Sequence, residues 1–161
     1  MHRVQGNPNT PTIECVNPIK NKWRIRWDYQ QRQDGTTDYM EAEFSHKPSQ
    51  DEIKQMVTAW YNDIIDQQIR SGFTFEDNTV WLSQENQFNY KAAYDLAVQT
   101  NGQSLPVTVK LGTDQKPVYR TFSTLDEFHN LYTAALAYIQ QTLADGWKMK
   151  DQFNIEDYSI L

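Results

Sequence analysis

The sequence predicts an α+β fold of three successive β-hairpin-plus-helix units, with antiparallel sheets and helices packed on one face. Three observations support this prediction. Short runs of alternating apolar and polar residues come in pairs, turn-forming residues join each pair, and a longer run with helical spacing follows. The chain has 161 residues, 39% hydrophobic and 13% aromatic, which is enough for one domain or two small subdomains.

Local composition divides the chain into four expected segments. Residues 1–11 contain two prolines among Asn, Gly and Thr, so we expect a flexible lead-in. An N-terminal hairpin–helix subdomain should follow over 12–71, and a C-terminal domain over 72–151. Residues 152–161 form a short tail, and the spacing of its apolar side chains leaves open whether it docks on the body.

Strict alternation indicates the first hairpin, with its turn at Asp34-Gly35. One face should carry the apolar side chains of Trp23, Ile25, Trp27, Tyr29, Met40, Ala42 and Phe44. We expect the rings of Trp23 and Trp27 to be buried there. The opposite face should carry the charged side chains of Arg24, Arg26, Glu41 and Glu43. Opposite charges across an antiparallel pair stabilise it by about 0.2–1 kcal/mol each, so the apolar pattern and the charge pattern support one another.

Each expected helix follows an N-cap residue. Ser49 with Glu52, and Thr124 with Glu127, match the capping-box pattern, in which the two side chains bond each other's backbone N–H groups. Ser83 is the third N-cap. The expected helices run over about 50–70, from 84 to about 99, and from 125 towards Gly146, which should end or fray the last one.

Two further hairpins precede the second and third helices. One is expected over 73–82 with its turn at 76–78, and the other over 105–122 with its turn at 112–116. The third helix should cover the last hairpin. Its covering side chains would be Leu125, Phe128, Tyr132, Ile139 and Leu143, over Leu105, Val107, Val109 and Phe122.

Composition also bears on location and partners. The chain has 15 Lys plus Arg against 21 Asp plus Glu, a net charge of −6, whereas nucleic-acid binders usually carry excess positive charge. No apolar run reaches the roughly 18–20 residues of a membrane span, and the N-terminus lacks the apolar segment of a signal peptide. We therefore expect a soluble protein that does not enter a membrane. The single cysteine, Cys15, cannot form an internal disulfide, which fits a reducing compartment.

Residues suited to metal binding or nucleophilic catalysis are few. His2, His46 and His129 do not have the spacing of metal sites, and one cysteine cannot form a thiolate cluster. Cys15 lies among apolar residues, where a small buried side chain is the ordinary interpretation. No nucleophile elbow or glycine-rich phosphate loop is present. We expect no metal, no cofactor and no catalytic residue.

Acidic pairs are the remaining candidates for catalysis. Asp51-Glu52 and Asp126-Glu127 fall in expected first turns of helices, where negative charge complements the helix dipole. Structural capping accounts for them without general acid/base chemistry. The sequence therefore predicts that the protein is not an enzyme.

Two aromatic patterns have alternative interpretations. Residues 20–27 interleave basic and aromatic side chains, as single-strand nucleic-acid platforms do. Alternation places rings and guanidinium groups on opposite faces, which favours a half-buried strand over such a platform. In the second helix Phe88, Ala92 and Leu96 form one stripe at helical spacing, and Tyr90, Tyr94 and Val98 form another. The stripe of Tyr90 and Tyr94 is either a second core face or a partner-binding surface. The core is favoured, and these two tyrosines are the candidate partner-binding residues.

Several stretches of the C-terminal half resemble a known family: GFTF, VWLSQENQFNYKAAYDLA, LPVTVKLGTDQKPVYRTFSTLDEF and YIQQTLADGWKMKD. Over residues 72 to about 151 the chain is similar to an uncharacterised domain family of phage and prophage tail-region proteins. The segments VNPIKNKWRIRWDY and YMEAEFSHKPSQDEI resemble the region preceding that domain in versions from gut Bacteroides-type bacteria and their phages. The resemblance supplies no catalytic residue.

The resemblance implies a non-enzymatic structural or assembly protein of a phage or prophage tail that acts through protein–protein contacts. Its expected partners are tail or fibre proteins, or further copies of itself. Such a protein works in the bacterial cytoplasm during assembly or in the virion. The alternative is a small binding or regulatory module for nucleic acid or a host protein.

Overall fold

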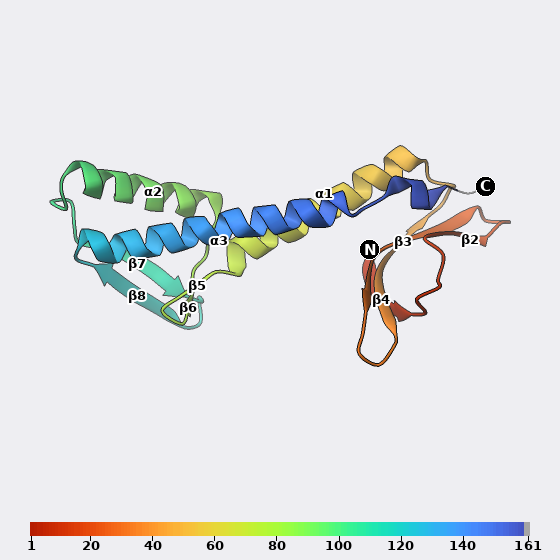
Figure 1. Ribbon diagram of the computed structural model, residues 1–161, viewed down its shortest axis with the longest axis horizontal. Coiled ribbons are helices and arrows are strands. Elements are labelled where there is room, and N and C mark those ends of the chain that lie inside the picture. The colour runs from red at the N-terminus through yellow and green to blue at the C-terminus, as the bar shows by residue number, and fades with distance from the viewer. Residues whose placement is uncertain (160–161) are drawn as a thin grey trace. The chain divides into compact units, whose positions relative to one another are not determined.

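The computed structural model describes residues 1–159 and has an α+β architecture (Figure 1). It divides into two compact units, one of residues 1–61 with 149 onward, the other of residues 62–148. The boundaries fall inside the helices α1 (Gln50–Ser71) and α3 (Leu125–Asp151), not at residue 72 as the sequence suggested. The reason is that α1 contributes side chains to two apolar cores: Ile53 and Val57 to one, Ile65 and Ile69 to the other.

The first unit contains a four-stranded antiparallel sheet in the order β1-β4-β3-β2. Its strands are β1 (His2–Gly6), β2 (Ile13–Asn17), β3 (Lys22–Gln31) and β4 (Thr37–Phe44). Ile25 pairs with Ala42 and Trp27 with Met40, and these four side chains are buried with α1 residues in one core. The predicted alternation of β3 and β4 is confirmed, although the Trp23 ring is only half-buried.

Two expectations for this sheet were wrong. The expected flexible lead-in contains β1, which pairs along β4 and satisfies the backbone groups of that edge. Tyr29 does not share the face of Trp27, because Asp28, with φ 55°, forms a β-bulge that adds one residue to β3. The bulge turns Tyr29 to the other face, where its ring lies 5.2 Å from that of Tyr39.

The C-terminal tail docks on the first unit. A 3₁₀ turn, η1 (Ile155–Tyr158), buries the ring of Tyr158, whose hydroxyl donates to the backbone oxygen of Arg26 at 2.7 Å. Thr12 Oγ1 donates to the backbone oxygen of Asp157 at 2.6 Å. These contacts join residues far apart in the sequence, so the spacing of apolar residues within the tail did not predict that it docks. Ile160 and Leu161, the last apolar residues of the tail, lie outside the described residues.

The second unit has two small hairpins and three helical segments. Its strands are β5 (Thr74–Phe75) paired with β6 (Asn78–Thr79), and β7 (Val107–Gly112) paired with β8 (Pro117–Phe122). The helix α2 (Gln84–Gln99) lies between the hairpins in sequence, and parts of α1 and α3 complete the unit. The three predicted hairpin–helix units are therefore present, with helices packed against antiparallel sheets.

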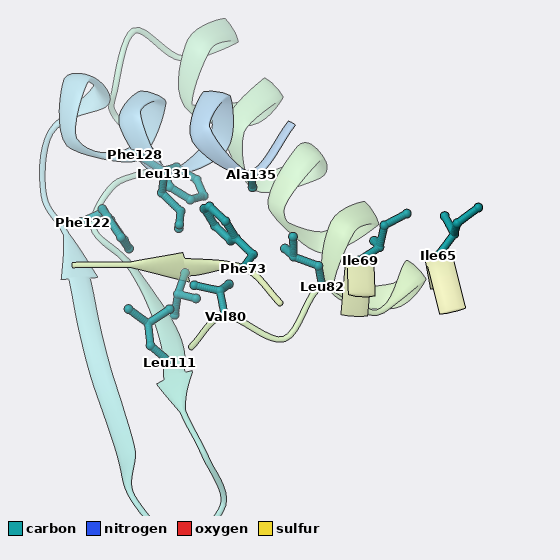
Figure 2. Packing of buried hydrophobic residues seen from close by; sticks show 11 residues of the cluster. Ile65, Ile69, Phe73, Val80, Leu82, Leu111, Phe122, Phe128, Leu131 and Ala135 are labelled. Atoms are coloured by element: carbon teal, nitrogen blue, oxygen red, sulfur yellow. The ribbon is translucent and has the colours of Figure 1, made fainter. Parts of the chain in front are cut away.

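The core of this unit joins β7, β8 and α3 (Figure 2). Phe122 and Phe128 are fully buried with ring centroids 5.4 Å apart, and Val109 and Leu111 lie in the same cluster. The prediction that α3 covers this hairpin is confirmed for Phe128. Tyr132 instead stacks on Tyr94 of α2, and Leu125 is half-buried outside the core cluster.

Local signals placed the helix ends well. Glu52 accepts from the Ser49 backbone at 2.8 Å, and Glu127 accepts from Thr124 at 3.1 Å, so both capping boxes are confirmed. Gly146, however, neither ends nor frays α3, which continues to Asp151. A Cβ at this buried glycine would collide with the side chain of Ile65. The glycine gives the two helices room for close contact.

We expect Glu52→Gln to reduce the loss of stability in acid. Backbone and hydroxyl hydrogen bonds from Ser49, together with the His46 ring, lower the pKa of Glu52 from 4.5 to about 2. A pKa lowered by folding stabilises the protein above the unfolded value, and this stabilisation is lost as the pH falls towards about 2. Glutamine still caps the helix but does not titrate.

Urea unfolding at about pH 5 and about pH 3 checks this expectation. The free energy of unfolding should fall less between these pH values in Glu52→Gln than in the wild type. Asp51→Asn, in the same helical turn but outside the capping box, is the control. Equal losses in Glu52→Gln and wild type would contradict the prediction.

Candidate protein-interaction surface

Helix α2 carries an exposed apolar stripe. Phe88 is 71% exposed and Leu96 is 51% exposed, with the exposed Ala92 between them at spacing i, i+4, i+8. Among the residues of α2 only Ala97 is fully buried. The sequence pattern showed two stripes on this helix, and the structure leaves this one in solvent.

An apolar groove lies beside the stripe, between α2 and α3. It encloses about 240 Å³ and is lined by Phe88 and Tyr90 of α2 and by Tyr132, Leu136 and Ile139 of α3. Leu136 is itself 41% exposed. We call Phe88, Ala92, Leu96, Leu136 and this groove the α2–α3 surface.

The two predicted partner-binding residues lie on this part of the molecule in different roles. Tyr90 lines the groove, and its burial raises the pKa of its hydroxyl. Tyr94 does not line it; its ring stacks on Tyr132 with centroids 4.5 Å apart, and its hydroxyl is 2.6 Å from His129 Nδ1. The rings of Tyr90 and Tyr94 also pack against the core of the second unit. Tyr94 thus fixes α2 on α3, and only Tyr90 faces the groove.

Polar side chains border this surface. Lys91 forms a hydrogen-bonded ion pair with Asp95 one turn along α2, and this bond raises the pKa of Lys91. Gln87 also lines the groove. An apolar centre with a polar border is the usual composition of a protein–protein contact area, and exposed apolar patches of this kind mark binding sites.

The residues considered for metal or nucleophilic chemistry are dispersed. His46 is 2.9 Å from Glu52, His129 contacts Tyr94, and His2 Nε2 is 3.9 Å from Glu41. Cys15 is a free, half-buried cysteine. Within residues 1–159 no three His, Cys, Asp or Glu side chains gather where a metal ion could bind. No helix in this described part has the length and apolar character needed to span a membrane.

The basic-aromatic strand places its groups as predicted. Arg24 pairs with Glu43 at 2.7 Å, and Arg26 pairs with Glu41 at 2.8 Å, on the face opposite Trp27. Each guanidinium group is therefore engaged by a carboxylate of the neighbouring strand. The strand does not present these arginines and Trp27 together on one exposed face.

Sequence reasoning missed a second, larger groove in the same unit. It encloses about 900 Å³ between α2 and β7 and is lined by Asn86, Asn89 and Tyr90 of α2 and by Thr108 and Lys110 of β7, among others. The exposed ring of Trp81 lies at this groove too. Alternation predicted strand β7 but did not say which of its edges is covered.

Comparisons of the chain with protein-family models, with curated proteins and with solved structures gave no significant match.

Proposed function

We propose that the protein is a non-enzymatic structural or assembly protein of a phage or prophage tail, acting through protein–protein contacts. The observation that carries the proposal is the α2–α3 surface, with the exposed side chains of Phe88, Leu96 and Leu136 beside an apolar groove. The resemblance of residues 72–151 to tail-region proteins supplies the biological setting. Such a protein acts in the bacterial cytoplasm during assembly or as part of the virion.

The energetic argument concerns what a partner gains by covering this surface. Full burial of a large apolar side chain contributes about 1.5–3 kcal/mol. Phe88 and Leu96 make little use of this contribution within the chain itself, because α2 leaves them in solvent. A partner that covers both residues and fills the groove gains that burial without breaking the core of the unit.

The shape of the surface favours an amphipathic helix of a tail or fibre protein. The stripe covers eight residue steps of α2, about 12 Å along the helix axis. Apolar anchors at i and i+4 on a partner helix match such a stripe and the groove between two helices. Association with a second copy of this chain is the other outcome that the experiment separates.

Co-purification tests the proposal directly. The full-length protein, carrying an affinity tag, is co-expressed with tail and fibre proteins from the same genome, as wild type and as Phe88→Asp. We expect a named tail protein to co-purify with the wild type and to be reduced at least tenfold with Phe88→Asp, because a charge would be buried in an apolar contact. Ile19→Asp, at a residue 97% exposed in the first unit, is the matched control.

Two results oppose the proposal. Retention of no tail protein by the wild type is one, and equal retention by wild type and Phe88→Asp is the other. Sedimentation of the purified protein, without any partner, shows whether it associates with itself. A wild-type dimer that Phe88→Asp converts to monomer would assign the surface to a second copy in place of a partner helix.

A further inference from the structure

We propose that the groove between α2 and β7 binds an extended polypeptide segment, which adds to β7 as a third strand. The lining of the groove shows that it runs along an edge of β7. Consecutive residues from Val107 to Lys110 line it, although their side chains alternate between faces, and no residue of β8 does. A groove over one face of the ribbon would include side chains of both strands.

Hydrogen-bond pairing identifies which backbone groups of β7 face the groove. Thr113 and Lys116 exchange both backbone hydrogen bonds at the end of the hairpin, at 3.2 and 3.1 Å. In an antiparallel ladder, residue pairs that exchange both backbone hydrogen bonds alternate with residue pairs that exchange no backbone hydrogen bond. The register has no bulge, so this alternation can be counted back along β7 from Thr113. It makes Thr108 and Lys110 members of pairs that exchange no backbone hydrogen bond with β8. Their N–H and C=O groups point away from β8.

Two further features agree with this assignment. Pro117 has no N–H to donate, and it pairs with Gly112, another position that exchanges no bonds. The hydroxyls of Thr108 and Thr121 are 2.9 Å apart, as fits the closer side chains of such pairs. Within residues 1–159, β8 is the only strand that pairs with β7. β6 lies close to β7 but forms no ladder with it, so the outward backbone groups of Thr108 and Lys110 have no strand partner in the described residues.

The chemistry of the groove specifies its occupant. Alternating backbone donors and acceptors along a strand edge are complementary to the backbone of another extended chain. On the inner side Tyr90 and Ala93 offer apolar contacts, while Asn86 and Asn89 offer amide groups. β7 has six residues, so the edge is about 20 Å long. The matching ligand is a segment of about six residues with an apolar side chain at every second position.

This site goes beyond the proposed function and lies on a different face of α2 from Phe88 and Leu96, although Tyr90 lines both grooves. Asn86, Asn89 and Ala93 face β7, whereas Phe88 and Leu96 belong to the α2–α3 surface. The Phe88→Asp variant should consequently bind an extended peptide as the wild type does. The co-purification of a tail protein and the binding of an extended peptide can therefore fail independently of each other, and each failure is recognised in its own experiment.

Selection from a displayed library of random linear dodecapeptides, followed by synthesis of the enriched peptides, provides the probe. Lys110→Pro removes an outward N–H that the β7–β8 ladder does not use, so the fold should tolerate it. We expect the affinity of the selected peptides to fall about tenfold or more. Tyr119→Pro makes the same change on the outer edge of β8, opposite Lys110, and should leave the affinity unchanged.

A second variant covers the case in which Lys110→Pro does not fold. Asn89→Trp fills the groove from the exposed surface of α2 without altering β7 and should also abolish binding. Amide exchange of Thr108 and Lys110 should slow when the peptide is bound. The proposal is overturned if no peptide is enriched, if Asn89→Trp binds as the wild type does, or if the bound peptide is helical.

Discussion

Phe128→Ala should lower the free energy of unfolding by about 3–5 kcal/mol. The ring of Phe128 is fully buried, 5.4 Å from the ring of Phe122 and 6.2 Å from that of Tyr94. Truncation loses the transfer free energy of the ring and leaves a cavity between α3, the last hairpin and α2. The neighbouring rings are anchored in different elements, so they close this cavity only in part. Urea unfolding of the full-length protein measures the effect.

The matched control is Phe88→Ala, the same truncation on the exposed stripe of α2. We expect it to change the free energy of unfolding by no more than about 0.5 kcal/mol. An unchanged urea midpoint for Phe128→Ala would contradict the packing of α3 on the β7–β8 hairpin. In that case the apolar face of α3 would be free for a partner.

Arg26→Ala should have a comparable effect, about 3–5 kcal/mol, through electrostatics. Arg26 is only 4% exposed; it donates to Glu41 and Glu14 at 2.8 Å each and to the backbone oxygen of Pro11 at 2.9 Å. Glu41 is also buried. Removing the guanidinium group leaves the Glu41 carboxylate in a poorly solvated position without its main partner. Thermal and urea unfolding of the variant measure the loss.

Arg24→Ala is the control for this prediction. Arg24 pairs with Glu43 across the same two strands at 2.7 Å, with both side chains substantially exposed, and its Nε lies farther from Glu41, at 3.5 Å. Exposed ion pairs of this kind contribute about 0–1 kcal/mol. If Arg26→Ala cost no more than Arg24→Ala, the buried network around Glu41 would not stabilise the first unit as described.

The contrast between these arginines shows what alternation can predict. It placed Arg24 and Arg26 on the same face as Glu41 and Glu43, because alternation along two paired strands decides which side chains share a face. It did not predict that Arg26 is buried. The groups that cover it, Pro11 and Glu14, belong to preceding segments whose position depends on tertiary packing.

Helix ends were predictable because their signals are local. The predicted ends of α1 and α2 fall within about one residue of the observed ones, since capping side chains bond within the same turn. Gly146 was misinterpreted because a glycine stops a helix in isolation, whereas here contact with Ile65 gives it a packing role. Strand β1 was missed because its sequence, HRVQG, has no apolar face.

The candidate sites were predictable only in part, for a related reason. Periodicity revealed two apolar stripes on α2, but the covering elements decide which stripe is buried. Tyr94 was consequently offered as a partner-binding residue although it joins α2 to α3, and the exposed Phe88 was not. The groove beside β7 was not predicted for the same reason: alternation defines the faces of a strand and says nothing of its lateral neighbours.

Hydrogen–deuterium exchange of the full-length protein, alone and with a co-purified tail protein, tests the central proposal most directly. If the α2–α3 surface is the contact site, amide exchange should slow in α2 and in the part of α3 around Leu136 when the partner is bound. The four-stranded sheet of the first unit should exchange as it does in the free protein. Protection confined to that sheet, or no change anywhere on binding, would contradict the proposal.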